Sequence, residues 1–177
     1  VSPTDLGIKA SLASLQKSKV SPNEIDQLVA ANIGQSSYDS YFLPRHIGLF
    51  SGLPTEVPAL MVQRICGSGF ETIITAAEQI TLSKANAVLC TGAENMSLSP
   101  LVSFGNRMGF TLGKPVFKDM LWEALDDTAA GYPMGYTAEN IAQRYSITRK
   151  DCDVFALLSF NRAIAAQNKK YFQEEIA

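Results

Sequence analysis

The sequence is poor in the residues that most often bind metals or form disulfides: it has one histidine and three cysteines in 177 residues. The cysteines show no C-x-x-C spacing, which argues against a zinc site and against any resident metal. Few cysteines without a pairing pattern indicate a reducing compartment, which would be the cytoplasm, or the mitochondrion or peroxisome in a eukaryote. The sequence contains neither an apolar run long enough to span a bilayer nor a secretory leader.

The chain also lacks a large excess of either positive or negative charge. Lysine and arginine number 15 and acidic residues 17, so the formal net charge is -2. This balance argues against a dedicated nucleic-acid surface. Hydrophobic residues make up 46% of the chain and charged residues 18%, which is enough apolar material for a core. The sequence shows no internal repeat.

Short apolar runs alternate with helical patterns along the first half of the chain. Capping-box spacing with proline at the first helical position occurs at 2–5 and 21–24, and each box predicts a helix start. We expect strands at 27–33, 59–65 and 87–90, and helices at 44–53, 137–145 and 151–167, the last capped by Thr148. This alternation predicts an α/β fold with a parallel sheet and helices on both faces.

A further helix should follow Gly69. Its apolar stripe, predicted to be buried, is Phe70, Ile73, Ile74 and Ala77. The region 98–133 then has no sustained periodicity and is long for a connection, which is typical of a substrate-facing or assembly loop. We expect its adjacent carboxylates, Asp126 and Asp127, to be solvated rather than to bind a metal.

Cys66 stands at the end of the predicted strand 59–65, and Gly67-Ser68-Gly69 follows it and lets the backbone bend sharply into a helix. In the first turn of that helix, unpaired N–H groups and the positive end of the macrodipole would favour a thiolate. A small buried hydrophobic residue is the alternative interpretation of any free cysteine. The glycines immediately after Cys66 favour the nucleophile.

The remaining candidates are weaker. Cys90 ends an apolar run and is predicted to be a core residue. Cys152 lies between Asp151 and Asp153, whose carboxylates would oppose a thiolate. Nothing in the spacing of His46 relates it to a reactive thiol.

Three ordered segments resemble the thiolase family. Val62–Gly69 is similar to the pattern V-x-R-x-C-G-S-G around the family's acyl-accepting cysteine. Leu89–Ser97 is similar to the strand ending in G-x-E-x-M-S, and Met134–Asn140 to the segment M-G-x-T-A-E-N. The resemblance extends over essentially the whole chain and implies the layered thiolase fold.

The resemblance further implies Claisen-type acyl transfer between coenzyme A thioesters, in the condensing or the thiolytic direction. Cys66 would carry the acyl group, and its backbone N–H would be one oxyanion donor. Met134 would line the acyl pocket, although an ordinary core methionine remains an alternative. The family implies no cofactor beyond coenzyme A thioester substrates, and it implies a homodimer or homotetramer.

Thiolases also use a histidine in G-H-P, a second cysteine in C-x-G and an asparagine in N-E-x, and the resemblance places all three in a C-terminal half that is not found here. We therefore expect residues 1–98 to be an N-terminal thiolase half without its first strand, and residues 99–177 to be part of an inserted loop domain. The C-terminal half would be absent, and the 177-residue segment alone should not turn over.

Rival functions fit the same residues less well. A dinucleotide site is disfavoured because Thr72 stands where the fingerprint after Gly67-x-Gly69 needs a third glycine. Ser68 lacks the G-x-S-x-G pattern of serine hydrolases. Two alternatives remain open: a condensing enzyme of the ketoacyl synthase type, and a non-catalytic thiolase-like subunit that binds acyl-CoA or a partner.

Overall fold

The computed structural model describes residues 1–110 and 112–177. The chain forms two compact units, Val1–Trp122 and Glu123–Ala177, and each is described by itself. The predicted boundary between residues 98 and 99, which rests on family resemblance, stays a prediction.

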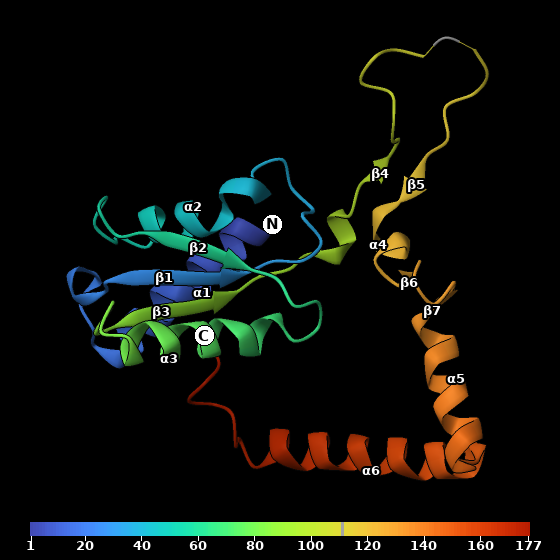
Figure 1. Cartoon of the computed structure of the whole chain (residues 1–177). Coiled ribbons are helices and arrows are strands. Elements are labelled where there is room, and N and C mark those ends of the chain that lie inside the picture. Colours follow the sequence, from blue (N-terminus) through green and yellow to red (C-terminus); the bar gives the residue numbers. More distant parts are fainter. Residues whose placement is uncertain (111) are drawn as a thin grey trace. The chain divides into compact units, whose positions relative to one another are not determined.

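The first unit is built on a three-stranded parallel sheet in the order β2-β1-β3 (Figure 1). Its strands are β1 (Gln27–Ala31), β2 (Ala59–Val62) and β3 (Val88–Gly92). Ala31 pairs with Val62 on one side and with Gly92 on the other. The three strands therefore end at the same edge of the sheet, which confirms the predicted parallel arrangement.

Helices cover both faces of this sheet. Helices α1 (Pro3–Ser18) and α2 (Leu43–Phe50) pack on one face, and α3 (Ser68–Thr81) packs on the other (Figure 1). The main core lies between β1 and the first two helices, because Leu28 and Ala30 point to that side and cluster with Leu43 and Ile47 of α2. The fold class predicted from the alternating pattern is confirmed.

The first capping box begins a long helix and the second does not. Before α1, Ser2 accepts a hydrogen bond from the Asp5 amide at 3.0 Å, and Asp5 accepts one from the Ser2 amide at 3.3 Å. The box at Ser21 also forms, but it starts only a 3-10 turn, η1 (Pro22–Glu24). The predicted helix there is wrong because β1 begins at Gln27 and leaves no room for a second turn.

Helix α3 turns a different face to the sheet from the one predicted. Its buried side chains are small: Ser68, Thr72 and Ala76. The predicted buried stripe is wrong, since all four of its members are exposed: Phe70, Ile73, Ile74 and Ala77. Small side chains let the helix axis approach β1 and β3 closely, and periodicity alone does not show which of two adjacent faces makes this contact.

The rest of the first unit is short elements at the sheet's carboxyl edge and beyond it. Strand β2 ends at Val62, three residues before its predicted end, because the chain turns there toward Cys66. The remaining elements are η2 (Ser40–Phe42), η3 (Met96–Leu98), the antiparallel pair β4 (Leu101–Val102) and β5 (Lys118–Asp119), and α4 (Met120–Glu123), which reaches the unit boundary.

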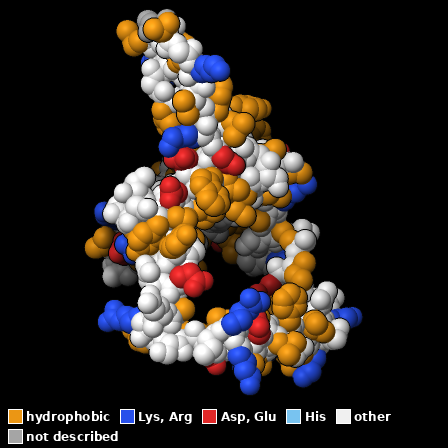
Figure 2. Space-filling view, turned by 90° about the vertical axis from the view of Figure 1, so that its right-hand side faces the viewer, with side chains coloured by type: hydrophobic (Ala, Val, Ile, Leu, Met, Phe, Trp, Pro, Cys, Tyr) orange, Lys and Arg blue, Asp and Glu red, His pale blue; other side chains and the backbone are white. Residues whose placement is uncertain are grey.

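The second unit consists of an antiparallel pair, β6 (Asp126–Asp127) with β7 (Tyr132–Pro133), and two helices. Helices α5 (Met134–Tyr145) and α6 (Arg149–Asn168) confirm the predicted helices, and Thr148 caps α6 by accepting from the Asp151 amide at 3.2 Å. Apolar side chains are visible at the molecular surface among charged ones (Figure 2). In the described chain, no helix combines the length and apolarity that crossing a bilayer requires.

Candidate active site

Cys66 lies in a tight double turn between β2 and α3. The Gly67 amide donates to the Arg64 carbonyl at 2.9 Å, and the Ser68 amide donates to the Ile65 carbonyl at 3.1 Å. Gly67 is the N-cap of α3, so Cys66 precedes the helix and does not lie in its first turn as predicted. The strand-to-helix turn itself is confirmed.

The turn contains backbone strain immediately before Cys66. Ile65 has φ +45°, in the left-handed region that a β-branched residue rarely adopts. Such a conformation costs about 1–3 kcal/mol and persists only where the surroundings hold it. Gly67 also has little freedom, because a Cβ there would lie 3.3 Å from the Arg64 carbonyl oxygen. The chain therefore accepts a cost to present Cys66 in this place.

Ser68 bonds to the strained segment through its side chain. Its hydroxyl accepts a hydrogen bond from the Arg64 amide at 2.7 Å and donates one to the Ile65 carbonyl at 2.6 Å. The side chain is 1% exposed. A second link joins Arg64 Nε to Glu71 Oε2 at 3.1 Å, although the arginine side chain is largely exposed. The end of the β2 segment is thus tied to the first turn of α3.

The three thiols have different surroundings. Cys66 is exposed, so its interpretation as a small buried hydrophobic residue is wrong. Cys90 lies in β3 as predicted, but it is half-buried; burial raises the pKa of its thiol, and its Sγ lies 3.4 Å from the Thr72 carbonyl oxygen. Cys152 is exposed in the first turn of α6. Only Cys66 combines exposure with a strained strand-to-helix turn.

The loops after β1 and β3 meet at the carboxyl edge of the same sheet. Glu94 accepts hydrogen bonds from the Ile33 amide at 2.8 Å, from the Gly34 amide at 3.2 Å and from Asn32 Nδ2 at 3.0 Å. Gln63, just after β2, donates to the Ile33 carbonyl at 3.5 Å. Sequence reasoning assigned no role to Glu94. The sequence did carry one signal for it: Glu94 comes directly after a predicted buried strand, and the loops that follow parallel strands lie together at one edge of the sheet.

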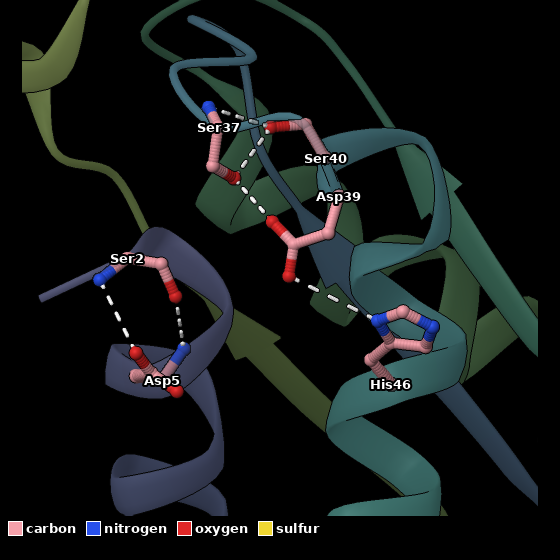
Figure 3. Close-up of polar contacts among 6 residues, drawn as sticks. All are labelled: Ser2, Asp5, Ser37, Asp39, Ser40 and His46. Atoms are coloured by element: carbon pink, nitrogen blue, oxygen red, sulfur yellow. Dashed lines mark hydrogen bonds and ion pairs between the residues drawn. The ribbon is translucent and has the colours of Figure 1, made fainter.

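His46 on α2 lies in a polar group with Ser37, Asp39 and Ser40 from the segment before that helix (Figure 3). Its Nδ1 lies 3.9 Å from Asp39 Oδ2, and its ring stacks on Phe42 and meets Phe50 edge-on. Asp39 accepts from the Ser37 hydroxyl at 2.5 Å, and this bond, more than the distant His46, holds the pKa of the carboxyl below its ordinary value. None of these contacts of His46 involves the Cys66 turn. Its predicted lack of a catalytic role stays a prediction.

Met134 is the first residue of α5, in the second unit, and its side chain is about half exposed. Its predicted role in lining the acyl pocket stays a prediction. Asp126 and Asp127 form β6 and pair with β7. Within residues 1–110 and 112–177, no cluster of three histidine, cysteine or carboxylate side chains could hold a metal ion.

Comparison with known proteins decides the family. The sequence model of the family described as "Thiolase, N-terminal domain" matches residues 1–177. The chain belongs to the thiolase family. It is 45% identical to mitochondrial 3-ketoacyl-CoA thiolase of Mus musculus, covering 99% of this chain and 45% of that thiolase. It is 36% identical to a probable acetyl-CoA acyltransferase of Staphylococcus aureus, covering 97% and 44% of the two chains.

Solved thiolases have the same fold. Human mitochondrial 3-ketoacyl-CoA thiolase in complex with CoA is 42% identical and superposes with a TM-score of 0.95, covering 99% of this chain and 45% of that one. Acetyl-CoA acetyltransferase of Bacillus anthracis is 33% identical with a TM-score of 0.93, covering 100% and 45%. The chain therefore spans less than half the length of the thiolases it matches.

Proposed function

We propose that this chain carries the acyl-accepting nucleophile of a thiolase-type acyltransferase, and that Cys66 is that nucleophile. One observation supports the proposal above all. The chain's exposed Cys66 thiol lies in a strained turn between a parallel strand and a helix, inside a segment matched along its whole length by the thiolase N-terminal domain.

In the thiolytic direction, the Cys66 thiolate attacks the keto carbon of a 3-ketoacyl-CoA. The bond between that carbon and the α-carbon breaks, its electron pair leaves with the acetyl-CoA portion, and the α-carbon takes up a proton. The acyl group remains on Cys66 as a thioester. The thiolate of a second coenzyme A then attacks this thioester, which releases acyl-CoA and regenerates the Cys66 thiolate. Condensation is the same sequence reversed.

The negative charge that develops on the attacked oxygen needs donors already in place. We assign one of them to the backbone N–H of Cys66. Among the described residues, no hydrogen bond uses this amide, while the next two amides are occupied by the Arg64 and Ile65 carbonyls. The amide precedes the N-terminus of α3, where the helix macrodipole also favours negative charge.

We extend the proposal to substrates and partners by family likeness. Coenzyme A thioesters are the proposed substrates, which the human thiolase solved in complex with CoA supports. Met134 is proposed to line the acyl pocket, and the active assembly to be a homodimer or homotetramer. The groups that move protons to and from Cys66 and the substrate are assigned to none of the residues described here. The proposed location is the cytoplasm, or the mitochondrion or peroxisome if the source is a eukaryote. The mitochondrial relatives favour the mitochondrion in that second case.

The test is thiolysis by the complete polypeptide with Cys66 replaced by serine. Removing the nucleophile should lower kcat by about a thousandfold or more, with an unchanged melting temperature because the side chain is exposed. Cys152→Ser is the matched control, since that thiol is also exposed, and it should retain full activity. Undiminished thiolysis by Cys66→Ser would exclude the proposed role and favour a non-catalytic function for this turn.

A further inference from the structure

We propose that Ser68 is a positioning residue for acyl transfer: its buried hydroxyl holds the strained Ile65 turn and thereby fixes the backbone amide and thiol of Cys66. The inference rests on the proposed function, because it takes Cys66 as the nucleophile. Ser68 itself would touch neither substrate nor the reacting atoms.

The two hydrogen bonds of the Ser68 hydroxyl are made to the backbone on either side of the strained residue, Ile65. Its hydroxyl accepts from the Arg64 amide at 2.7 Å, on one side of Ile65, and donates to the Ile65 carbonyl at 2.6 Å, on the other. Both bonds are short and use the donor and the acceptor capacity of one oxygen. They orient the Gln63–Arg64 peptide group and the Ile65–Cys66 peptide group, while the Arg64 carbonyl between them accepts from the Gly67 amide. Ile65, whose φ is +45°, is therefore held within a segment bonded at both ends to the same hydroxyl.

Burial makes this arrangement hard to replace. Ser68 is 1% exposed, so water cannot readily substitute for the hydroxyl. Without it, the Ile65 carbonyl keeps the Ser68 amide as its donor, but the Arg64 amide loses the partner found for it here. We then expect Ile65 to relax from the left-handed region toward a conformation that suits a β-branched residue, which would rotate the Cys66 amide.

The consequence should be specific to chemistry that depends on orientation. Acyl transfer needs the thiolate and the oxyanion donor aligned on one carbonyl group, and a displacement of about 1 Å can cost a hundredfold in rate. Alkylation by iodoacetamide needs only an accessible thiolate, since this small reagent can approach an exposed cysteine from many directions. Comparing the two rates separates positioning of Cys66 from its exposure.

The chain provides a matched control one helical turn further on. Thr72 is 3% exposed on the same helix face, and its hydroxyl donates to the Gly69 carbonyl at 2.8 Å. Ser68→Ala and Thr72→Val each remove one buried hydroxyl from α3, but only the first removes a contact with the Cys66 turn. Both are made in the complete polypeptide.

We expect Ser68→Ala to slow acylation of Cys66 by acetoacetyl-CoA, and kcat, by about ten- to one-hundredfold, with KM changed less than about threefold. Iodoacetamide should alkylate Cys66 at a rate within about threefold of the unaltered protein. Thr72→Val should acylate at the original rate. Equal losses in the two variants, or equal slowing of acylation and alkylation, would overturn the inference.

A second variant tests the proposed cause. Asparagine adopts the left-handed region far more readily than isoleucine, so Ile65→Asn should reduce the need for the serine hydroxyl. Added to Ser68→Ala, it should recover about three- to tenfold of the lost acylation rate, and it keeps the test available if Ser68→Ala alone does not fold. No recovery in a folded double variant would reject the role in holding Ile65.

Failure of the inference is distinguishable from failure of the proposed function. If Cys66→Ser abolishes transfer while Ser68→Ala acylates normally, only the role of Ser68 is rejected. If Cys66→Ser transfers acyl groups at the original rate, the nucleophile is wrong and the inference about Ser68 is rejected with it.

Discussion

β1 and β2 end at the same edge of one sheet, but the segments that follow them, called here the two exits, have different structures. After β1, the amides of Ile33 and Gly34 donate to the Glu94 carboxylate, which comes from the loop after β3. After β2, Ile65 is held at φ +45° by the hydroxyl of Ser68. The first exit gains charge-assisted hydrogen bonds to a carboxylate, and its left-handed residue is the unbranched Gln35, at φ +42°. The second holds a β-branched residue in that region and leaves a thiol exposed.

This difference separates residues that stabilise the edge from residues that shape its chemistry. Glu94 should matter mainly for the free energy of unfolding, and Ile65 mainly for where Cys66 lies. Strain of this kind is common at functional sites, where the surrounding structure holds it in place. Substitutions at the two exits should therefore affect stability in opposite directions.

Glu94→Ala should have the largest effect on stability. It removes the acceptor of the Ile33 and Gly34 amides and one of the two acceptors of Asn32 Nδ2, which keeps the Ala93 carbonyl, and it should lower the free energy of unfolding by about 2–3 kcal/mol. Urea unfolding of the complete polypeptide measures this loss. Glu78→Ala, which removes an exposed carboxylate from α3, should change stability by less than about 0.5 kcal/mol. An equal change in the free energy of unfolding for both variants would contradict the stabilising role assigned to Glu94.

Ile65→Asn should act in the opposite direction. Asparagine tolerates the left-handed conformation, and Ile65 is 54% exposed, so the free energy of unfolding should rise by about 1 kcal/mol. Ile80 is similarly exposed, but it lies within α3, where asparagine is a poorer helix former. Ile80→Asn should therefore destabilise by about 0.5 kcal/mol. A loss of stability at both positions would show that the φ of Ile65 carries no strain.

The smallest effect is expected within the loop after β1, at Asp39. Its pKa lies below the ordinary value of 3.8, chiefly because the Ser37 hydroxyl bonds to the carboxylate. A depressed pKa contributes stability above pH 3.8 that is lost as the pH falls through the folded-state value. Asp39→Asn should thus cost less than about 1 kcal/mol at pH 7, and the difference should shrink below pH 3.8. Urea unfolding at pH 7 and pH 3 measures this, and a difference independent of pH would contradict it.

Much of this edge could be predicted because its signals are local. The capping box at Ser2, the apolar runs of the strands and the glycine after Cys66 each act over a few residues, and they indicated α1, the parallel sheet and the strand-to-helix turn. The second capping box at Ser21 failed because a strand begins too soon after it. Local chemistry starts a helix, but the surrounding fold decides how long it continues.

Other features depend on contacts that no local pattern encodes. Periodicity identified an apolar stripe on α3 but not the small-residue face, including Ser68 and Thr72, that packs on the sheet. The role of Glu94 depends on loops about sixty residues away in sequence. The strain at Ile65 is a backbone conformation, and an isoleucine in the sequence gives no sign of it.

The most direct test of the central claim is the intact mass of the purified complete polypeptide after brief exposure to acetoacetyl-CoA. We predict one added acetyl group per chain in the unaltered protein and in Cys152→Ser, and none in Cys66→Ser. An acetyl group that persists in Cys66→Ser, or that is lost in Cys152→Ser, would contradict Cys66 as the acyl-accepting nucleophile.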